Sequence, residues 1–345
     1  MPRVSIIVPN FNHGRFLERR LRSIFEQTIQ DFELIFLDDA STDNSLEIFK
    51  KFANDSRVTL HVNKSNSGNP FVQWNKGLAL ATGQYIWIAE SDDFAEPTFL
   101  EMMIASLEKH PTAGLATCRS MITDQNDQDL ELFDAYHWFS DRQRWQHDYF
   151  NTGLAEISKY LAFQNTIPNA SATLFRRSLV EQGLRGPENM RIAGDWFFWV
   201  KLLSSSDICH VGQPLNHFRR EHQSSQRARS AADGMEVLEG IDVHDLVVQV
   251  VSMRDRTKLL AQMSLIRRWF SIASRYRIHF QVNRRIYRRF LSVNFDSWIA
   301  RTLQFLSVSL AFLLIPLASF PGFRSIAMWF RNLLTGSGQR SGISR

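Results

Sequence analysis

The 345-residue sequence predicts an α/β fold with a mostly parallel central sheet, followed by an α-helical C-terminal extension. Short apolar runs alternate with segments whose apolar residues recur at helical spacing, the pattern of strands joined by crossover helices. From about Ala231 onward only the helical spacing remains. We therefore expect one domain at residues 1–228 and a helical region at 229–345.

Four short, mostly apolar runs predict strands, in chain order Val4–Val8, Glu33–Leu37, Val58–Val62 and Tyr85–Ala89. Helical spacing predicts a helix after each of the first three, and a later aromatic helix over Ile192–Leu203. Ligands of such sheets bind beyond the carboxyl ends of the strands. The residues that follow the four runs are therefore the first place to look for a site.

The composition bears on whether the chain is ordered and on the cellular compartment in which we expect it. The formal net charge is +5, and no segment has the composition of a disordered chain. The two cysteines, Cys118 and Cys209, have no metal-site spacing, which favours a reducing compartment. The N-terminus enters the first predicted strand with no signal-peptide pattern, so we expect the cytoplasmic side.

An acidic turn, Glu90-Ser91-Asp92-Asp93, follows the fourth strand. Carboxylates at a strand end can hold a hard divalent cation that bridges phosphates and neutralises a diphosphate leaving group. The alternative is a solvated turn with an aspartate capping the next helix near Pro97. A second acidic strand end elsewhere in the sequence favours the cation.

That second acidic end is Asp38-Asp39, which continues as Ala40-Ser41-Thr42-Asp43. A carboxylate after a strand can accept hydrogen bonds from a ribose or a base edge. Ser41 or Asp43 could equally cap the following helix, and both interpretations can hold together.

Four motifs in order resemble family 2 glycosyltransferases over about residues 4–225. They are Val4–Asn12, the aspartate segment Phe32–Asp43, an Asn/Gly-rich segment with Asn66, Gly68, Asn75 and Gly77, and Gly83–Asp93. Ala40 stands where the family usually has glycine, and Glu90 where many members have aspartate.

The resemblance implies a GT-A fold, the fold of nucleotide-diphospho-sugar transferases, and a set of ligand contacts. The nucleotide would be bound by Pro9, Phe11, Asn12, Asp39, Asn66, Asn75 and Asp92, with Asp39 on the base and Asp92 on the ribose. Mn²⁺ or Mg²⁺ would be held by Asp93, Glu90 and His222. Arg220 would contact the diphosphate, since Arg220 and His222 resemble the Arg-x-His segment that often ends the catalytic domain.

Asp195 is the candidate catalytic base. A carboxylate at the lip of an aromatic pocket can have a raised pKa suited to general-base work, and Asp195 precedes Trp196-Phe197-Phe198-Trp199. In the resembling family an aspartate at this place removes the proton of the acceptor hydroxyl, giving inversion in one displacement. The alternative is that Asp195 only caps the helix.

The C-terminal region is basic and then apolar. No acidic residue occurs from Arg256 to Phe295, and 302–323 carries no charge. An apolar stripe through Leu265, Trp269, Ile272, Tyr276 and Phe280 with interspersed arginines suits an anionic membrane surface. The later run is near the length that spans a bilayer, and a helix lying in the interface or a kinked re-entrant helix is the alternative to a span. A helical bundle is the alternative. Nucleic acid is disfavoured, because the basic residues lead into an apolar run.

The sequence thus predicts an inverting, metal-dependent, hexosyltransferase-like enzyme that uses a nucleotide-sugar, expected to be a UDP-sugar, and a glycan or lipid-linked acceptor in cell-envelope polysaccharide synthesis. Its C-terminal region would hold it at the cytoplasmic side of the membrane, peripherally or as an anchor. A catalytically inactive nucleotide-sugar-binding protein is the alternative, against which Asp39, Asp92, Asp93 and Asp195 argue. A nucleotidyltransferase is disfavoured, because residues 9–14 contain no Gly-rich phosphate loop.

Overall fold

The computed structural model describes residues 1–134, 139, 141–167, 169–220, 233–276 and 278–315. The chain forms two compact units, the first made of Met1–Leu161 with Asn165–His222 and the second of Ala162–Gln164 with Gln223–Arg345. The expected boundary at residues 228 and 229 lies outside the described residues. Each unit is considered by itself.

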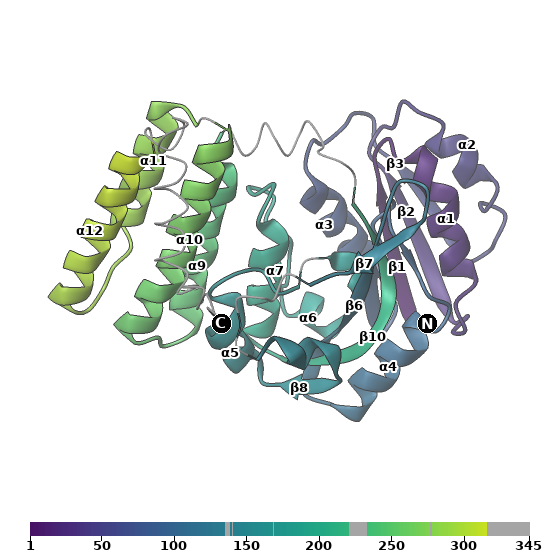
Figure 1. The fold of residues 1–345 in the computed structure, drawn as a ribbon. Coiled ribbons are helices and arrows are strands. Elements are labelled where there is room, and N and C mark those ends of the chain that lie inside the picture. The colour runs from purple at the N-terminus through teal and green to yellow at the C-terminus, as the bar shows by residue number, and fades with distance from the viewer. Residues whose placement is uncertain (135–138, 140, 168, 221–232, 277, 316–345) are drawn as a thin grey trace, which may run out of the picture. The chain divides into compact units, whose positions relative to one another are not determined.

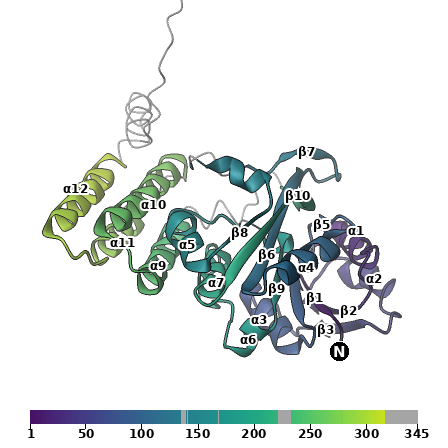
Figure 2. The ribbon, with the colours of Figure 1, turned by 90° about the horizontal axis from the view of Figure 1, so that it is seen from below.

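The first unit is built on a ten-stranded sheet (Figure 1). Its main path has the order β3-β2-β1-β4-β9-β6-β10-β5. These strands are Val58–Val62, Phe32–Asp38, Val4–Asn10, Tyr85–Ile88, Thr173–Arg176, Ala113–Thr123, Asp207–Arg219 and Phe94–Ala95. Strands β3, β2, β1 and β4 are parallel, β9 runs antiparallel between β4 and β6, and β6 and β10 are again parallel, side by side in Figure 2. The two short strands β7 (Asp129–Leu132) and β8 (Tyr149–Asn151) pair with β6 and β10.

Helices cover both faces of this sheet (Figure 1). On one face lie α1 (Gly14–Phe25), α2 (Ser45–Lys50) and α4 (Phe99–Lys109), whose apolar residues share a core with alternate residues of β1 and β2. The other face carries α3 (Pro70–Leu80), α6 (Ser178–Glu181) and α7 (Gly194–Leu203). Between β8 and α7, α5 (Gly153–Glu156) continues as the single π-turn Ile157–Leu161. The side chains of a strand alternate between the two faces, which explains why β1 and β2 are buried along nearly their whole length.

The four strands predicted at the start of the chain all form, with ends that differ by at most two residues. The predicted helix over Ile192–Leu203 begins two residues later, at Gly194. One close approach explains why α3 fits the sheet: a Cβ atom at Gly77 would lie 2.4 Å from the side chain of Ile7. A glycine there lets the helix axis come close to β1.

The second unit contains helices α9 (Met235–Val250), α10 (Asp255–Tyr276), α11 (Phe280–Leu291) and α12 (Trp298–Leu314). Of the predicted apolar stripe, Leu265, Trp269 and Ile272 are buried within this unit, Tyr276 is half-buried and Phe280 is 60% exposed. The indole N–H of Trp269 donates to Asn283 Oδ1 at 2.8 Å. The first three residues of the stripe therefore belong to a helical core, as the bundle alternative expects, and are not a free membrane-facing surface.

Among the described residues no helix combines the length and the hydropathy needed to cross a bilayer. The uncharged run 302–323 is described only as far as Ile315, and its remainder lies outside the described residues.

Candidate active site

Three parallel strands end side by side at one edge of the sheet. Strand β1 pairs with β2 on one side and with β4 on the other. The chain passes from β1 through α1 to β2, and later returns through α3 to β4 on the opposite side of β1, so the strand order reverses here. In open α/β sheets such a switch point opens a crevice beyond the carboxyl ends of the strands. The residues that follow β1, β2 and β4 share this edge.

The ends of β1 and β2 are joined by hydrogen bonds. Asn10 Nδ2 donates to Asp38 Oδ1 at 3.0 Å, and the backbone N–H of Asp39 donates to Asn10 O at 2.8 Å. Ser41 N donates to the other oxygen of Asp38 at 2.9 Å. The Asp38 carboxylate therefore stabilises the turn, whereas the side chain of Asp39 takes no part in these bonds.

Of the nucleotide-contact candidates from the first motif, only two reach the surface. Pro9 is buried within β1, whereas Phe11 is 40% exposed and Asn12 is exposed. Asn12 has φ 57°, in the left-handed region, and its Oδ1 accepts a bond of 2.7 Å from the backbone N–H of Thr42. Asn12 therefore ties the two loops, and Phe11 is the free aromatic ring at this edge.

Asp39 is 5% exposed, and its carboxylate accepts hydrogen bonds from three residues. The donors are Asn63 Nδ2 at 2.7 Å, Gln73 Nε2 at 2.8 Å, and both Oγ and the backbone N–H of Ser67, at 2.7 and 3.0 Å. A carboxylate offers about four acceptor positions. Any base N–H that Asp39 binds would therefore join or replace one of these internal donors.

The rest of the aspartate segment has structural roles. Asp43 Oδ2 accepts from Gly14 N at 2.8 Å and Oδ1 from Ser45 N at 3.0 Å, so one carboxylate caps the first turns of both α1 and α2. The capping interpretation is thus right for Asp43, while Ser41 contacts the β1 turn instead. Ala40 has φ 62°, a conformation that favours glycine.

The two asparagines of the third motif differ. Asn66 is exposed and its side chain accepts from Gly68 N. Asn75 donates from Nδ2 to Gly186 O at 3.0 Å and to Glu188 Oε1 at 2.8 Å, and its Oδ1 accepts from Gly186 N at 2.7 Å. The side chain of Asn75 thus anchors the loop that leads to α7.

The acidic turn after β4 directs its carboxylates in different directions. Glu90 Oε1 accepts from the indole N–H of Trp74 at 2.9 Å, whereas Asp93 Oδ1 accepts from the backbone N–H of Arg219 at 3.0 Å. Burial, and then repulsion from Asp92, raises the pKa of Glu90 to about 8 and that of Asp93 to about 6. Asp92 is half-buried between them.

A buried arginine lies beneath this turn, and sequence reasoning missed it. Arg20 of α1 is fully buried, and its Nε donates to the backbone oxygen of Glu90 at 2.8 Å. Both terminal guanidinium nitrogens lack a hydrogen-bond partner within the described part of the chain. Burial lowers its pKa to about 10, opposed by the charges of Asp93, Asp92 and Glu90. The signal was available, because Arg20 falls on the apolar face defined by Leu17, Leu21 and Ile24.

The carboxylates of the acidic turn provide only part of the metal site predicted from Asp93, Glu90 and His222. The described residues contain no group of three His, Cys, Asp or Glu side chains that could hold an ion. Glu90 is turned toward Trp74, and His222 lies outside the described residues. Mg²⁺, however, is usually bound by one or two carboxylates together with substrate phosphates. Asp92 and Asp93 fit that smaller donor set.

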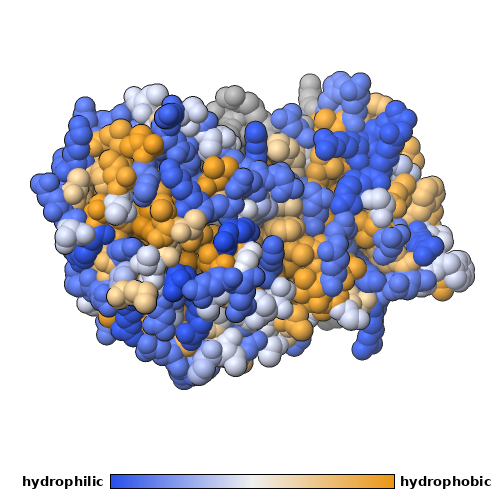
Figure 3. Space-filling view, turned by 180° about the vertical axis from the view of Figure 1, so that it is seen from behind, coloured by the Kyte–Doolittle hydropathy of each residue, from blue (hydrophilic) through white to orange (hydrophobic). Residues whose placement is uncertain are grey.

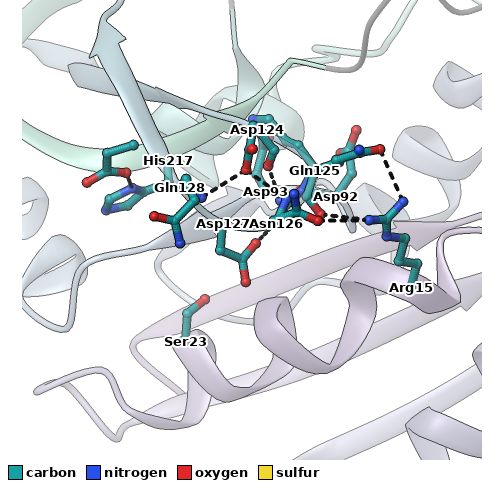
Figure 4. A network of polar contacts seen from close by, with 12 residues as sticks. Arg15, Ser23, Asp92, Asp93, Asp124, Gln125, Asn126, Asp127, Gln128 and His217 are labelled. Atoms are coloured by element: carbon teal, nitrogen blue, oxygen red, sulfur yellow. Dashed lines mark hydrogen bonds and ion pairs between the residues drawn. The ribbon is translucent and has the colours of Figure 1, made fainter.

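A hairpin loop, Asp124–Gln128, lies against the acidic turn and the start of α1 (Figure 4). Buried Arg219 joins the parts: Nε donates to Asp92 O at 2.8 Å, one terminal nitrogen to Asp124 O at 2.6 Å, and the other bonds the Asp127 carboxylate. Arg15 of α1 bonds the same loop from its other side. No pattern in the sequence predicted this loop.

The candidate phosphate ligand Arg220 is the residue after Arg219 in the chain. Its backbone N–H donates to Thr123 O at 3.0 Å, and its side chain is exposed, with the nearest carboxylate, that of Glu131, at 3.8 Å. The exposed guanidinium, paired with Glu131, could still meet an anion, and it forms no ion pair with Asp92 or Asp93.

Asp195 is the second residue of α7 and is half-buried. Its Oδ2 accepts from Asn165 Nδ2 at 2.9 Å, and its Oδ1 from the backbone N–H of Trp196 at 2.7 Å. The start of α7 is seated closely, because a Cβ atom at Gly194 would lie 2.3 Å from the ring of Phe71. Asp195 is therefore oriented by Asn165 inside the first turn, and the residue at the cap position is Ala193.

The segment Asn165–Ser171 connects Asp195 to the acidic turn. At one end Asn165 holds Asp195, and at the other Ser171 Oγ accepts from Glu90 N at 3.0 Å. Asn169 Nδ2 in this segment is buried without a hydrogen-bond partner in the described chain. A small pocket of about 20 Å³ borders the segment, lined by Thr117, Cys118, Arg119, Ser120, Phe133, Thr166, Ile167, Asn169, Ala172 and His210.

The fold and this edge define a class, the nucleotide-diphospho-sugar transferases with a GT-A fold. Comparison with known proteins gives the family: the model of glycosyl transferase family 2 matches residues 5–184, more than half of the chain, so this chain belongs to that family.

Curated relatives match the N-terminal part. The poly(ribitol-phosphate) β-N-acetylglucosaminyltransferase TarP of Staphylococcus aureus is 39% identical over 105 residues, 29% of this chain and 32% of that protein. The chondroitin synthase of Pasteurella multocida is 32% identical over 139 residues, 40% of this chain and 14% of that protein. The matches thus span well under half of these relatives.

Solved structures share the fold across the chain. S. aureus TarS 1–349 in complex with UDP-GlcNAc has a TM-score of 0.62 at 15% identity, covering 95% of this chain and 91% of that one. The mannosyltransferase PcManGT from Pyrobaculum calidifontis, in complex with GDP-Man and Mn²⁺, has a TM-score of 0.52 at 17% identity, covering 97% and 86%. At these identities the likeness shows the GT-A fold alone.

Proposed function

We propose that this chain is an inverting, metal-dependent glycosyltransferase that moves a sugar from a UDP-sugar to a hydroxyl of a glycan or lipid-linked acceptor in cell-envelope polysaccharide synthesis. The observation that carries the proposal is the segment Asn165–Ser171, which holds the Asp195 carboxylate at one end and the acidic turn at the other, beside a pocket. A displacement at an anomeric carbon needs a base on the acceptor side and charge neutralisation on the leaving-group side.

Asp195 is the base of this reaction. The acceptor oxygen attacks the anomeric carbon as its proton passes to an Asp195 carboxylate oxygen, and the bond from that carbon to the diphosphate oxygen breaks. One in-line displacement inverts the configuration. Asn165 orients the carboxylate, which keeps the oxygen that faces the acceptor in place.

The nucleotide diphosphate lies at the switch-point edge. Phe11 offers an exposed ring against the base, and Asp39 accepts a base N–H. Asp92 contacts the ribose, Asn12 and Asn66 are further nucleotide contacts, and Arg220 meets the diphosphate. Asp92 and Asp93 would hold Mn²⁺ or Mg²⁺, which when bound supplies Lewis-acid neutralisation of the diphosphate. Buried Pro9 and the anchored Asn75 support this edge rather than extend into it.

Donor and acceptor class draw support from the relatives. TarS 1–349 is described in complex with UDP-GlcNAc, and PcManGT with GDP-Man and Mn²⁺. TarP is named a poly(ribitol-phosphate) β-N-acetylglucosaminyltransferase, and the Pasteurella multocida protein is named a chondroitin synthase. These names favour a nucleotide-sugar donor and a polymer acceptor for this chain.

We test the function with purified protein, a panel of UDP-sugars and Mn²⁺ or Mg²⁺, measuring UDP release with and without candidate acceptors. Asp195→Asn is expected to lower acceptor-dependent turnover by about 10²- to 10⁴-fold while UDP binding persists. Unchanged turnover in Asp195→Asn would reject the base. Nucleotide-sugar binding with no turnover for any donor would support the inactive binding protein instead.

We also propose that the second unit holds the enzyme at the cytoplasmic side of the membrane, peripherally. The support is the surface of α12, on which large apolar side chains are exposed. Vesicle binding tests this placement independently of UDP release.

A further inference from the structure

Helix α12 carries its larger apolar side chains on the outside. The fully buried residues of the helix are small or polar, namely Ala300, Gln304, Val308 and Ala311, and the half-buried Phe312 is the large apolar residue that contacts α10 and α11. The exposed residues are Trp298 (74%), Ile299 (53%), Leu303 (48%), Phe305 (52%), Leu306 (56%), Leu310 (41%) and Leu313 (66%). A surface helix of a water-soluble unit normally shows the opposite arrangement.

These exposed residues form one continuous face. At 100° per residue they fall within a single arc of roughly half the helix circumference, interrupted only by Thr302 and Ser309. Patches of apolar side chains among charged ones are also visible on the surface seen from behind (Figure 3). A contiguous apolar face of this size marks an interaction site rather than scattered surface residues.

Helix α11 adds positive charge beside this face. Tyr287 of α11 contacts α12, its hydroxyl 3.2 Å from Ser309 Oγ and its ring 4.9 Å from that of Phe312. Arg284 and Arg288 lie at i−3 and i+1 from Tyr287, on the adjoining side of α11, and both are exposed. The apolar face of α12 is thus bordered by guanidinium groups.

Two groups of arginines in the second unit differ in whether they form ion pairs. Arg268 bonds Glu236, and Arg289 bonds Asp242 and Asp245, so these two hold the helices together. The exposed side chains of Arg284, Arg285 and Arg288 form no ion pair with the described residues. Their charge is available to an external anionic surface.

We propose that the outer face of α12 docks onto an anionic lipid bilayer, with the helix lying along the interface and the α11 arginines on the headgroups. This inference rests on the proposed membrane placement and names the surface that performs it. Charge complementarity selects lipid over a second copy of the chain, since a symmetric contact would place the arginines of two copies near each other. Trp298 at the start of the helix suits an interface between water and hydrocarbon.

The test is flotation of the full-length protein with phosphatidylcholine vesicles, with or without phosphatidylglycerol. We expect binding that increases with phosphatidylglycerol and weakens with salt. Leu306→Gln is expected to weaken binding roughly tenfold, since it replaces a large apolar side chain on the docking face with a polar one. Arg284→Gln is expected to weaken binding on the order of fivefold, and only to anionic vesicles.

Leu60→Gln is the matched control, because Leu60 is an exposed leucine (45%) on β3 of the first unit and should leave binding unchanged. Vesicle binding that is equal in wild type, Leu306→Gln and Arg284→Gln would overturn the proposal. So would light scattering that shows a wild-type dimer which Leu306→Gln converts to a monomer. Donor-dependent UDP release in detergent-free buffer, measured on the same variants, separates failure of docking from failure of the enzymatic function.

Discussion

Arg20 donates a hydrogen bond of 2.8 Å from Nε to the backbone oxygen of Glu90, and does so from a fully buried position. The same face of α1 continues to hold the segment after the acidic turn: Ser23 Oγ accepts from Ala95 N at 3.3 Å, and Gln27 Oε1 accepts from Leu100 N at 2.9 Å. Helix α1 thus positions the acidic turn from below, and Arg20 is the only charged member of that set.

Substituting Arg20→Met is expected to destabilise the fold by about 3 kcal/mol, since removing one partner of a buried charge cluster leaves the others uncompensated. Urea unfolding measures this change. Mn²⁺ should restore more stability to the variant than to the wild type, because an added cation replaces the missing charge. Arg22→Met, on the exposed side of the same helix, should leave the midpoint nearly unchanged. Equal effects of the two variants would contradict the role of Arg20.

Gly194→Ala is expected to lower turnover without loss of donor binding. The new Cβ would lie 2.3 Å from the ring of Phe71, so the start of α7 and Asp195 must shift. Because the clash is with one side chain, Phe71→Leu in the same chain should restore part of the activity. Steady-state kinetics of the single and double variants measures the coupling, and independent, additive effects would argue against the contact.

Asn165→Ala removes the donor that orients Asp195 Oδ2. We expect kcat to fall roughly tenfold or more with the donor KM unchanged, because the base remains but its orientation is lost. Asn165→Asp should be worse, since it places a second carboxylate beside the first. Asn54→Ala, at an exposed asparagine in the first unit, is the control and should leave both constants unchanged.

The burial of His210 leads us to expect that the folded protein loses stability at acidic pH. Its Nδ1 lies 2.8 Å from Thr117 Oγ1 and its Nε2 3.0 Å from Trp145 O, and burial lowers its pKa to about 4 from 6.5. The unfolded chain therefore binds the proton more readily between these values. The resulting contribution to the free energy of unfolding, up to about 3 kcal/mol, is present in full above pH 6.5 and is lost as the pH falls toward 4.

Unfolding midpoints of the wild type and His210→Gln across pH 4 to 7 check this slope. The variant should be less stable at pH 7 but flatter with pH. Parallel curves for the two proteins would show that His210 does not titrate on unfolding.

Local patterns in the sequence predicted much of this site. The runs that end at Asn10, Asp39 and Glu90 were recognisable because strand periodicity and acidic termini are local features. Because parallel strands end at the same edge of a sheet, these runs were expected to end close together. The structure forms them as β1, β2 and β4, which are neighbours in the sheet. The order of the motifs was sufficient to identify the family.

Features that depend on long-range contacts were not predicted. Asn165 gave no signal because its partner is thirty residues away, and the hairpin loop reaches Arg15 and Arg219 only after β6 and β10 pair. Leu265, Trp269 and Ile272 of the stripe were interpreted as membrane-facing, yet they are buried because neighbouring helices cover them. Amphipathic spacing identifies an apolar face and cannot say what covers that face.

The sequence by itself determined the strands, the α/β class and the identity of the acidic and basic residues, since these depend on spacing along the chain. Only the tertiary structure decided which of them act together. It committed Asp43 and Asn75 to structural bonds, placed Arg20 under the acidic turn, and left the large apolar residues of α12 exposed. The physical reason is that burial and hydrogen-bond partners arise from contacts between residues far apart in the chain, and these contacts decide which polar groups remain free for a ligand.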